Sequence, residues 1–317
     1  MPTLERKILV IIAFILILVL LALVPLVIRG YWLHLLTEIL ILSLFAVSLN
    51  LILGYGGMLS FGHAGFYGLG LYISAGFMKY GISMPISLLA GALAATIAGG
   101  LIGFVTVKLR SFYFAILTLA FGQLIWAIIF KWYKITGGED GIVGVPVPEW
   151  LSHEQNLYLF IYIVVLLCIS AIFVIVKSPF GRFLSAIREN SERTESIGIN
   201  VNMHRFAAFV IAAFFAGIAG GMHCLHAKAA FPDLVAWTKS GEVLITCVLG
   251  GMYTFVGPII GAVIMILLNS LVSTLFIERW PLVLGGIFIF VALFLPEGIT
   301  GTIKDRFAMI VKGRGVV

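Results

Sequence analysis

Charged residues are scarce in this sequence, and their scarcity defines the class of protein. Asp, Glu, Lys and Arg make up 11% of the 317 residues, against 62% hydrophobic residues, and the mean hydropathy is +1.16. A soluble domain needs more polar side chains than this to cover its surface in water. The composition therefore excludes a soluble globular protein and predicts a polytopic membrane protein.

The sequence also lacks the motifs by which a chain hydrolyses nucleotides, couples to an ion gradient, catalyses a reaction or binds a metal. It contains no Gly-Lys dipeptide, which excludes a Walker A phosphate loop. No pair of acidic residues and no basic residue lies deep in an apolar run, as ion-driven carriers usually require. No nucleophile–base or metal-ligand constellation is apparent, so we expect no enzyme activity, no metal site and no cofactor in this chain. The energy for active transport must then come from a partner.

Cysteines are few, and the basic residues occupy only short loops. Cys168, Cys224 and Cys247 lie inside apolar runs without a CxxC spacing, so we interpret them as small buried side chains. The net charge of +6 comes from Lys and Arg between the apolar runs. This placement is typical of a membrane protein's cytoplasmic side and does not indicate a nucleic-acid partner.

Apolar runs long enough to cross a bilayer predict an all-α fold with about ten transmembrane helices in a single domain, 1–317. The runs are Ile8–Ile28, Ile39–Met78, Tyr80–Val107, Ser111–Phe130, Leu157–Val176, Phe206–Ala227, Val243–Ile277 and Trp280–Pro296. As one straight helix the second run would measure about 60 Å, roughly twice the bilayer thickness. It must therefore fold back on itself, and so must Val243–Ile277.

Glycine-rich stretches mark where these two long runs break. The residues concerned are Gly56, Gly57, Ser60, Gly62 and His63 in the first break, and Gly250 and Gly251 in the second. Both breaks contain a Gly-Gly-Met-x-[Ser/Thr]-Phe pattern, which suggests a parallel internal repeat. Broken helices often border a substrate path, because exposed backbone is tolerated only against protein or water. Gating and close helix packing are equally compatible with both breaks.

Other glycines and polar residues in the runs have structural interpretations. Three glycine pairs at i, i+4 spacing predict close helix packing: Gly99/Gly103, Gly217/Gly221 and Gly257/Gly261. His63 is expected to be hydrogen-bonded structure, and His223 and His226 lack an acid or Cys to complete a metal site. Glu242 is interpreted as a cap at the start of its helix.

Loop charges orient the chain. With the N-terminus inside, thirteen of the twenty Lys and Arg fall on the inside and seven on the outside. The bias predicts that both termini are cytoplasmic. It also predicts a cytoplasmic loop at 177–205, an external loop at 132–156 and a cytoplasmic tail at 297–317.

The loop 177–205 is the most polar stretch of the chain. Pro179 should end the preceding membrane helix, because proline removes a backbone donor and disfavours helix at the residue before it. The segment Phe180–Glu189 can then form an amphipathic helix. Its apolar face is Phe183, Leu184 and Ile187, and its polar face is Arg182 and Arg188.

A second short helix, Ser191–Ile197, is predicted directly after the amphipathic segment. Asn190 or Ser191 can cap its N-terminus, and Gly198 suits the left-handed residue that ends it. The residues alone leave two interpretations open. The loop is either a solvated connection or a lever that a separate ATPase moves.

Blocks of sequence in a fixed order indicate a known family. They include Asn50-Leu51-x-Leu53-Gly54-Tyr55-x-Gly57-x-Leu59-Ser60-Phe61-Gly62-His63-Ala64, Thr136-Gly137-Gly138-x-Asp140-Gly141, Gly181-Arg182-x-Leu184-x-Ala186-Ile187-Arg188-Glu189-Asn190 and Phe294-x-Pro296-x-Gly298. In these blocks the chain resembles the LivM-type permease subunits of bacterial branched-chain amino-acid ABC importers, over most of its length. The resemblance implies import of branched-chain or related amino acids. A urea or short-amide ABC permease is the closest rival, and an ion-coupled secondary transporter is the rival from another class.

The resemblance also implies partners and a location. These are a homologous second permease subunit, two ATP-binding cassette ATPase subunits that hydrolyse ATP with Mg²⁺, an extracytoplasmic substrate-binding protein, and the lipid of the bacterial cytoplasmic (inner) membrane. In importer permeases a helix with the pattern Glu-Ala-Ala-x3-Gly docks on the ATPase. Glu192 and Gly198 match this pattern, whereas Arg193 and Thr194 replace the two alanines.

Two sets of site residues follow from the resemblance. The implied ATPase-coupling residues are Arg188, Glu189, Asn190, Glu192, Arg193 and Gly198. The implied docking edge for the binding protein is Gly137, Gly138, Glu139 and Asp140. An acidic, solvated turn is the alternative interpretation of that edge.

Overall fold

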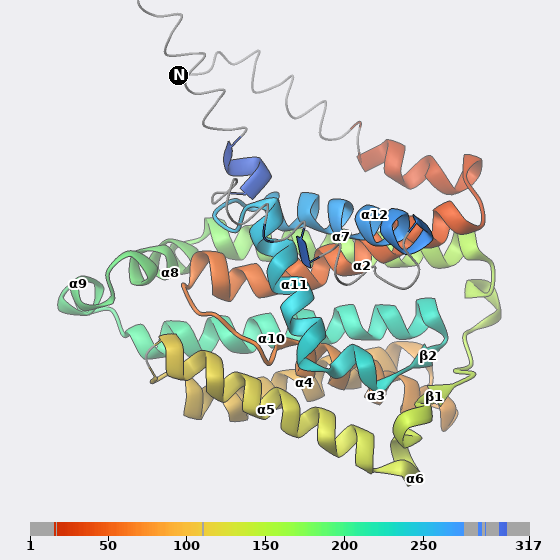
Figure 1. Ribbon diagram of the computed structural model, residues 1–317, viewed down its shortest axis with the longest axis horizontal. Helices are drawn as coiled ribbons and strands as arrows, with labels where there is room; N and C mark the ends of the chain where they lie inside the picture. Colours follow the sequence, from red (N-terminus) through yellow and green to blue (C-terminus); the bar gives the residue numbers. More distant parts are fainter. Residues whose placement is uncertain are drawn as a thin grey trace, which may run out of the picture.

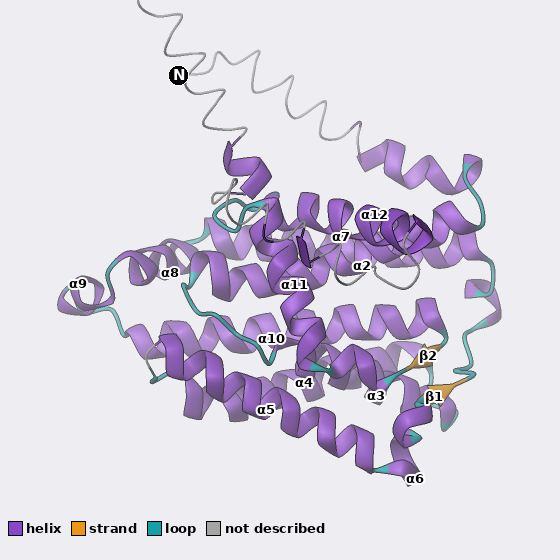
Figure 2. Cartoon of the chain, in the orientation of Figure 1, coloured by secondary structure: helices purple, strands orange, loops and turns teal. Residues whose placement is uncertain are grey.

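The computed structural model describes residues 16, 18–109, 111–275, 285–286, 289 and 298–302, and this part of the chain is almost entirely helical (Figures 1 and 2). The longer helices are α2 (Tyr31–Asn50), α3 (His63–Lys79), α4 (Met84–Thr106), α5 (Ser111–Lys131), α7 (Glu154–Lys177), α8 (Pro179–Glu189), α10 (Val201–Ala227), α11 (Trp237–Gly250) and α12 (Gly257–Leu275). The shorter elements are η1 (Leu51–Tyr55), α6 (Tyr133–Thr136), η2 (Gly138–Asp140), β1 (Ile142–Val143), η3 (Glu149–Leu151), α9 (Ser191–Ser196), β2 (Ala229–Ala230) and η4 (Pro232–Val235).

Five described helices are long and apolar enough to cross a membrane, which confirms the prediction of an all-α polytopic membrane protein. They are Tyr31–Tyr55, Met84–Thr106, Phe112–Lys131, Glu154–Lys177 and Val201–Ala227. The predicted pass Ile8–Ile28 is described only in part, and Leu18–Val27 forms a short apolar helix there. The predicted pass Trp280–Pro296 falls mostly outside the described residues. At 14 residues, α11 is shorter than a bilayer crossing requires, so it does not form a full pass by itself.

The helices form stacked layers, as Figure 1 shows. Helices α7 and α12 cover one side of α2, and α10 lies on the other side of α2. Helices α3 and α4 pack against α10, and α5 forms the far edge, where it contacts α3. Helix α11 runs steeply across these layers toward α12 (Figure 1). Helices α2 and α10 are therefore the most enclosed, and both are mostly buried.

Glycines bring α4 and α10 close together, as their spacing predicts. A β-carbon added at Gly99 would lie 2.5 Å from the Cβ of Ala213, and one at Gly217 would lie 2.6 Å from the Cβ of Ala95. The space around Gly103 and Gly221 is similarly filled. The packing interpretation of these pairs is confirmed, and dispersion contacts that only glycine permits hold the two helices together.

Replacing Gly220 with alanine should lower the thermal stability of the permease in detergent. The new methyl group would overlap the backbone carbonyl oxygen of Tyr67 on α3, and neither backbone can move without disturbing its helix. We expect a loss of about 1–3 kcal/mol, typical of overpacking. The matched control is Gly76→Ala on α3, where nothing lies within 4 Å of the new atom. Equal unfolding temperatures for the two variants would contradict this packing.

Loops that were predicted on the same side of the membrane lie together. At one end, Gly57, Val107, Leu109 and Arg205 line a common small cavity. At the other end, β1 pairs with β2 in an antiparallel ladder, Lys79 Nζ donates to the Val143 carbonyl at 3.5 Å, and Gly30 N donates to Glu154 at 3.1 Å. The described loops thus divide into two groups at opposite ends of the bundle.

The two predicted loops contain short elements. Within 177–205, α7 ends at Lys177, α8 and α9 follow, and α10 begins at Val201. The segment 132–156 contains α6, η2, β1 and η3 and ends at the start of α7. One predicted role is wrong. Glu242 does not cap its helix, because α11 begins at Trp237; Glu242 instead pairs with Lys239, with both carboxylate oxygens 2.9 Å from Nζ.

Candidate functional site: the junction of the two helix breaks with α8

The first glycine-rich stretch ends one helix before another begins. Helix α2 continues into the π-helical turn η1, and the chain is non-helical from Gly56 until α3 starts at His63. Gly57 has a φ of +66°, a left-handed conformation that favours glycine. π-Helical turns are rare and often occur at functional sites.

The second glycine-rich stretch also separates two helices and contains a glycine with positive φ. Helix α11 ends at Gly250, Gly251 has a φ of +113°, and α12 starts at Gly257. Gly57 and Gly251 occupy the same position in the shared Gly-Gly-Met pattern, so the pattern places a glycine with positive φ at the same point of both breaks.

The two breaks contact each other, although they lie about 200 residues apart in the sequence. The Asn50 side-chain amide donates to the Thr254 carbonyl oxygen at 3.3 Å. A β-carbon at Gly54 would overlap the carbonyl oxygen of Met252. The start of the predicted C-terminal tail joins them, because the Thr300 hydroxyl lies 2.8 Å from that of Thr254. The breaks therefore form one junction rather than two separate gates.

Helix α8 lies beside this junction and α9 follows it, and the local structure of both helices confirms the sequence predictions. The α7 helix ends before Pro179, and α8 buries Leu184 and Ile187. The Asn190 side chain caps α9 by accepting from the backbone N–H of Arg193 at 2.9 Å. Gly198 has a φ of +88° directly after α9.

Helix α9 extends away from the bundle at one end of the molecule (Figure 1). The predicted coupling residues Glu189, Asn190, Glu192, Arg193 and Gly198 are all exposed, whereas Thr194 is buried against the chain. Ile197, at the end of α9, is 71% exposed. A polar helix with an exposed apolar residue at its tip is the kind of surface that a partner protein can bind.

The Arg188 side chain does not lie on a water-exposed polar face, contrary to the prediction. Its side chain does not face water with Arg182 but is only 27% exposed and lies in the junction. One guanidinium nitrogen donates to the carbonyl oxygen of Gly54, in the π-helical turn. The guanidinium carbon lies 5.0 Å from the centre of the Tyr253 ring, within reach of a cation–π interaction.

The aliphatic carbons of the Arg188 side chain also pack closely against the first break. A β-carbon at Gly57 would lie 2.8 Å from the Arg188 Cγ, so glycine makes room for the arginine. Gly54 lies in the last turn before the helix ends, where backbone carbonyls lack an intrahelical donor, and the guanidinium supplies one. This need of the backbone outweighs the preference of Arg188 for water. The side chain thus connects α8 to both breaks.

Other residues of the first break have packing roles. The His63 ring is fully buried, stacks on Phe45 with ring centres 5.4 Å apart, and its Nε2 lies 3.0 Å from the Ser48 hydroxyl. This confirms the expectation of a hydrogen-bonded structural histidine. Gly62 has no room for a side chain, because a β-carbon would overlap the Thr118 carbonyl. Ser60 is also fully buried.

The predicted docking edge lies at the opposite end of the bundle from α9. Gly137 and Gly138 both have positive φ, and Glu139 and Asp140 are exposed. The Tyr133 hydroxyl donates to Asp140 at 3.2 Å, which fixes the turn. Because β1 follows this turn directly, its pairing with β2 holds the turn beside the loop that follows α10.

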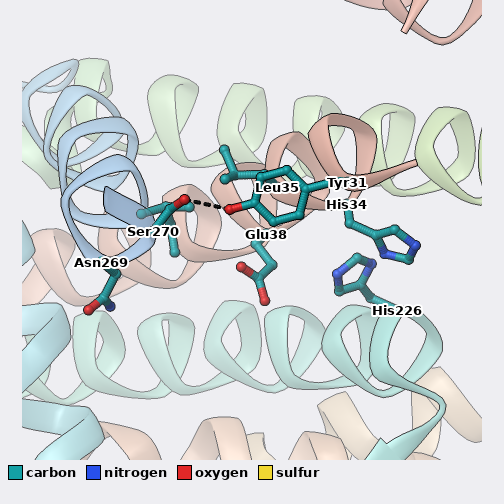
Figure 3. A pocket seen from close by; sticks show the side chains of 8 residues that line it. Tyr31, His34, Leu35, Glu38, His226, Asn269 and Ser270 are labelled. Carbon is teal, nitrogen blue, oxygen red and sulfur yellow. Dashed lines mark hydrogen bonds between the residues drawn. The ribbon is translucent and has the colours of Figure 1, made fainter. Parts of the chain in front are cut away.

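A cavity of about 430 Å³ lies near the same end, among α2, α10 and α12 (Figure 3). Its lining is Tyr31, His34, Leu35, Glu38, His226, Ile266, Asn269 and Ser270. The Tyr31 and Ser270 hydroxyls are hydrogen-bonded across it, and the rings of His34 and His226 lie 5.2 Å apart. Within the described ranges no group of three His, Cys, Asp or Glu side chains could hold a metal ion.

Comparison with known proteins assigns the chain to a family. Residues 31–293 match the model of the family described as branched-chain amino acid transport system / permease component. The chain belongs to this family. It is therefore a membrane permease subunit of an ABC importer.

Named relatives of this permease transport different compounds. The high-affinity branched-chain amino acid permease LivM of Escherichia coli is 30% identical over 291 residues, which cover 83% of this chain and 68% of the relative. The ribose import permease RbsC of Haemophilus influenzae is 24% identical over 70% of this chain and 69% of its own length. The nucleoside permease NupC of Lactococcus lactis is 24% identical over 68% of this chain and 74% of its own length. No solved structure matches.

Sequence reasoning missed the cavity of this permease. Glu38 stands directly before the run Ile39–Met78, and no role was predicted for it. His34 and His226 are 192 positions apart, and only the packing of α2 on α10 brings them together. The available signal was the spacing of Tyr31, His34 and Glu38, which places three polar side chains on one helix face.

Proposed function

We propose that this permease imports branched-chain or chemically related amino acids, using ATP that two partner ATPase subunits hydrolyse. A homologous second permease subunit completes the pathway, and an extracytoplasmic binding protein delivers the substrate. The names of the LivM relatives support the substrate class. The observation that carries the mechanism is the position of Arg188, which connects α8 to both glycine breaks.

The proposed topology is about ten passes in the bacterial cytoplasmic membrane, with two Gly-rich breaks and both termini inside. The excess of Lys and Arg in the loops around α8 and α9 supports this orientation. Two sets of loop contacts agree with it, because the cavity at Gly57, Val107 and Arg205 and the ladder between β1 and β2 each join loops of one predicted side.

The proposed coupling element is α9 together with α8. An ATPase can do work on the permease only if it binds α9 differently in its open and closed states. Glu192 and Gly198 match the family pattern, and Ile197 offers an apolar anchor for the ATPase surface. A displacement of α8 would be transmitted through Arg188 to the junction of the two breaks.

The junction is the proposed gate of the substrate path. Its residues are Gly56, Gly57, Ser60, Gly62, His63, Gly250 and Gly251. Helix ends that meet at a backbone-to-backbone contact can separate without unfolding a helix, which suits a gate. Of these residues, Gly57 and Gly251 are glycines with positive φ where the helices are interrupted, and Gly62 and His63 anchor α3.

The proposed docking surface for the binding protein is the turn Gly137–Asp140. The ladder between β1 and β2 supports it by holding two outer loops as one surface. Two exposed acidic side chains, Glu139 and Asp140, give this surface a negative charge that a basic patch on the partner would complement.

Uptake by the purified transporter in liposomes tests the proposed function. We expect transport of radiolabelled leucine only when the ATPase subunits, the binding protein and ATP are all present. Ribose, a nucleoside and urea serve as competitors, because permeases for such compounds are similar. Uptake that follows an ion gradient in liposomes with this chain alone would contradict the proposal and favour a secondary transporter.

Replacing Glu192 with lysine should uncouple ATP hydrolysis from uptake. The carboxylate lies exposed in the first turn of α9, where it complements the helix N-terminus and is available to a partner. We expect uptake to fall roughly tenfold or more while membrane insertion is unchanged. The matched control is Glu149→Lys, an exposed acid at the other end of the bundle. Normal uptake by the Glu192→Lys transporter would count against α9 as the coupling element.

A further inference from the structure

The cavity among α2, α10 and α12 lies far from the coupling junction. Glu38 precedes Tyr55 by 17 residues, so the two are about 25 Å apart along the helix that α2 forms with η1. His226 is next to the end of α10, which leads into β2 and the paired outer loops. On the proposed orientation the cavity is therefore at the external end, where substrate enters.

One acidic side chain in this cavity has no polar partner among the described residues. The Glu38 carboxylate has no hydrogen bond or ion pair within the part of the chain that the structure describes. Lys239, on the neighbouring helix α11, is instead held by both oxygens of Glu242 at 2.9 Å. Because a carboxylate that is shielded from water is stable as the anion only when a cation accompanies it, an ammonium group supplied by a ligand would complete this site.

The rest of the lining suits a small molecule with both polar and apolar parts. Figure 3 shows the Glu38 carboxylate between the Asn269 amide on one side and the His34 and His226 rings on the other. Leu35 and Ile266 add apolar surface. A volume of about 430 Å³ is within the range of about 300–1,000 Å³ that small-molecule sites occupy.

We propose that this cavity is a binding site for the primary ammonium group of the transported amino acid, with Glu38 as its counter-ion. The inference rests on the proposed function and adds the chemical basis for its substrate class. The ammonium group donates to the Glu38 carboxylate, and the substrate carboxylate accepts from an N–H group of the histidines beside it. The substrate's apolar side chain packs against Leu35 and Ile266. A sugar or a nucleoside has no group that this carboxylate requires.

Protection of an introduced thiol tests the site without ATP or the binding protein. Ile266→Cys, in a chain with Cys168→Ala, places a reactive thiol in the cavity, and the remaining cysteines are buried. In membranes that hold the assembled transporter, leucine should slow maleimide labelling of this thiol. Its analogue without the amino group, 4-methylpentanoate, should not slow labelling at the same concentration.

The contribution of Glu38 is measured by adding Glu38→Gln to the same protein. We expect the leucine concentration for half-protection to rise roughly 10- to 100-fold, as for loss of a charged hydrogen bond. Glu38→Asp keeps the charge and should keep most of the protection, and Glu149→Gln, outside the cavity, should change nothing.

Two results would overturn the inference. One is absence of protection by leucine in the Ile266→Cys protein, and the other is equal protection in the Glu38→Gln variant or by 4-methylpentanoate. Because the assay requires no ATP hydrolysis, its failure is distinguishable from failure of ATP-driven uptake, which would instead refute the proposed function.

Discussion

Replacing Arg188 with alanine should abolish ATP-driven uptake while the assembled transporter continues to hydrolyse ATP. Arg188 is the α8 side chain that reaches both breaks, through the Gly54 carbonyl and the Tyr253 ring. Without it, α8 and α9 can still bind the ATPase, but their movement no longer reaches the junction. A coupling free energy of the usual size predicts that uptake falls roughly 10- to 100-fold. The measurement is the ratio of substrate imported to ATP hydrolysed in liposomes.

The chain provides a matched control on the same helix. Arg182 is an exposed arginine of α8, six residues before Arg188, and among the described residues its side chain makes no hydrogen bond, ion pair or cation–π contact with either break. Arg182→Ala should leave the ratio unchanged, and Arg188→Lys should give an intermediate value, because lysine keeps the charge but not the planar guanidinium. Equal ratios for Arg188→Ala and Arg182→Ala would refute the connection.

Replacing Gly54 with alanine should also abolish uptake, by separating the two breaks. The new methyl group would overlap the Met252 carbonyl oxygen, a backbone atom that no rotamer change can move. The breaks must then move apart, and Asn50 would lose its bond to Thr254. Overpacking of this kind typically costs about 1–3 kcal/mol, so a folded but inactive transporter is expected.

Uptake and thermal stability of the Gly54→Ala transporter are compared with those of Gly100→Ala. Gly100 lies on α4, and nothing is within 4 Å of an added β-carbon, so this variant should transport normally. If Gly54→Ala also transports at the normal rate, the contact between the two breaks has no part in gating.

Local signals in the sequence were sufficient to predict the elements around α8 and α9. Pro179 ended α7, Asn190 capped α9, and Gly198 adopted the left-handed conformation, because each of these effects depends only on neighbouring backbone. The glycine pairs of α4 and α10 were also interpreted correctly, since small residues at i, i+4 spacing indicate close packing whichever helix is the partner.

Contacts between distant segments could not be predicted in this way. Helical periodicity placed Arg188 on a polar face, but the segment that covers that face, the π-helical turn around Gly54, lies 134 positions away. The same limitation hid the cavity, because His34, His226 and Asn269 come from three helices. A sequence pattern identifies a polar side chain, whereas the tertiary structure determines whether water or protein surrounds it.

A photo-cross-linking amino acid in place of Ile197 tests the central claim most directly. Ile197 is 71% exposed at the end of α9, so a probe there samples whatever binds this helix in the intact cell. The account predicts a cross-link to the ATPase subunit, and the same cross-link in the Arg188→Ala transporter, whose uptake is lost. A cross-link to the extracytoplasmic binding protein, or none to an ATPase, would contradict it.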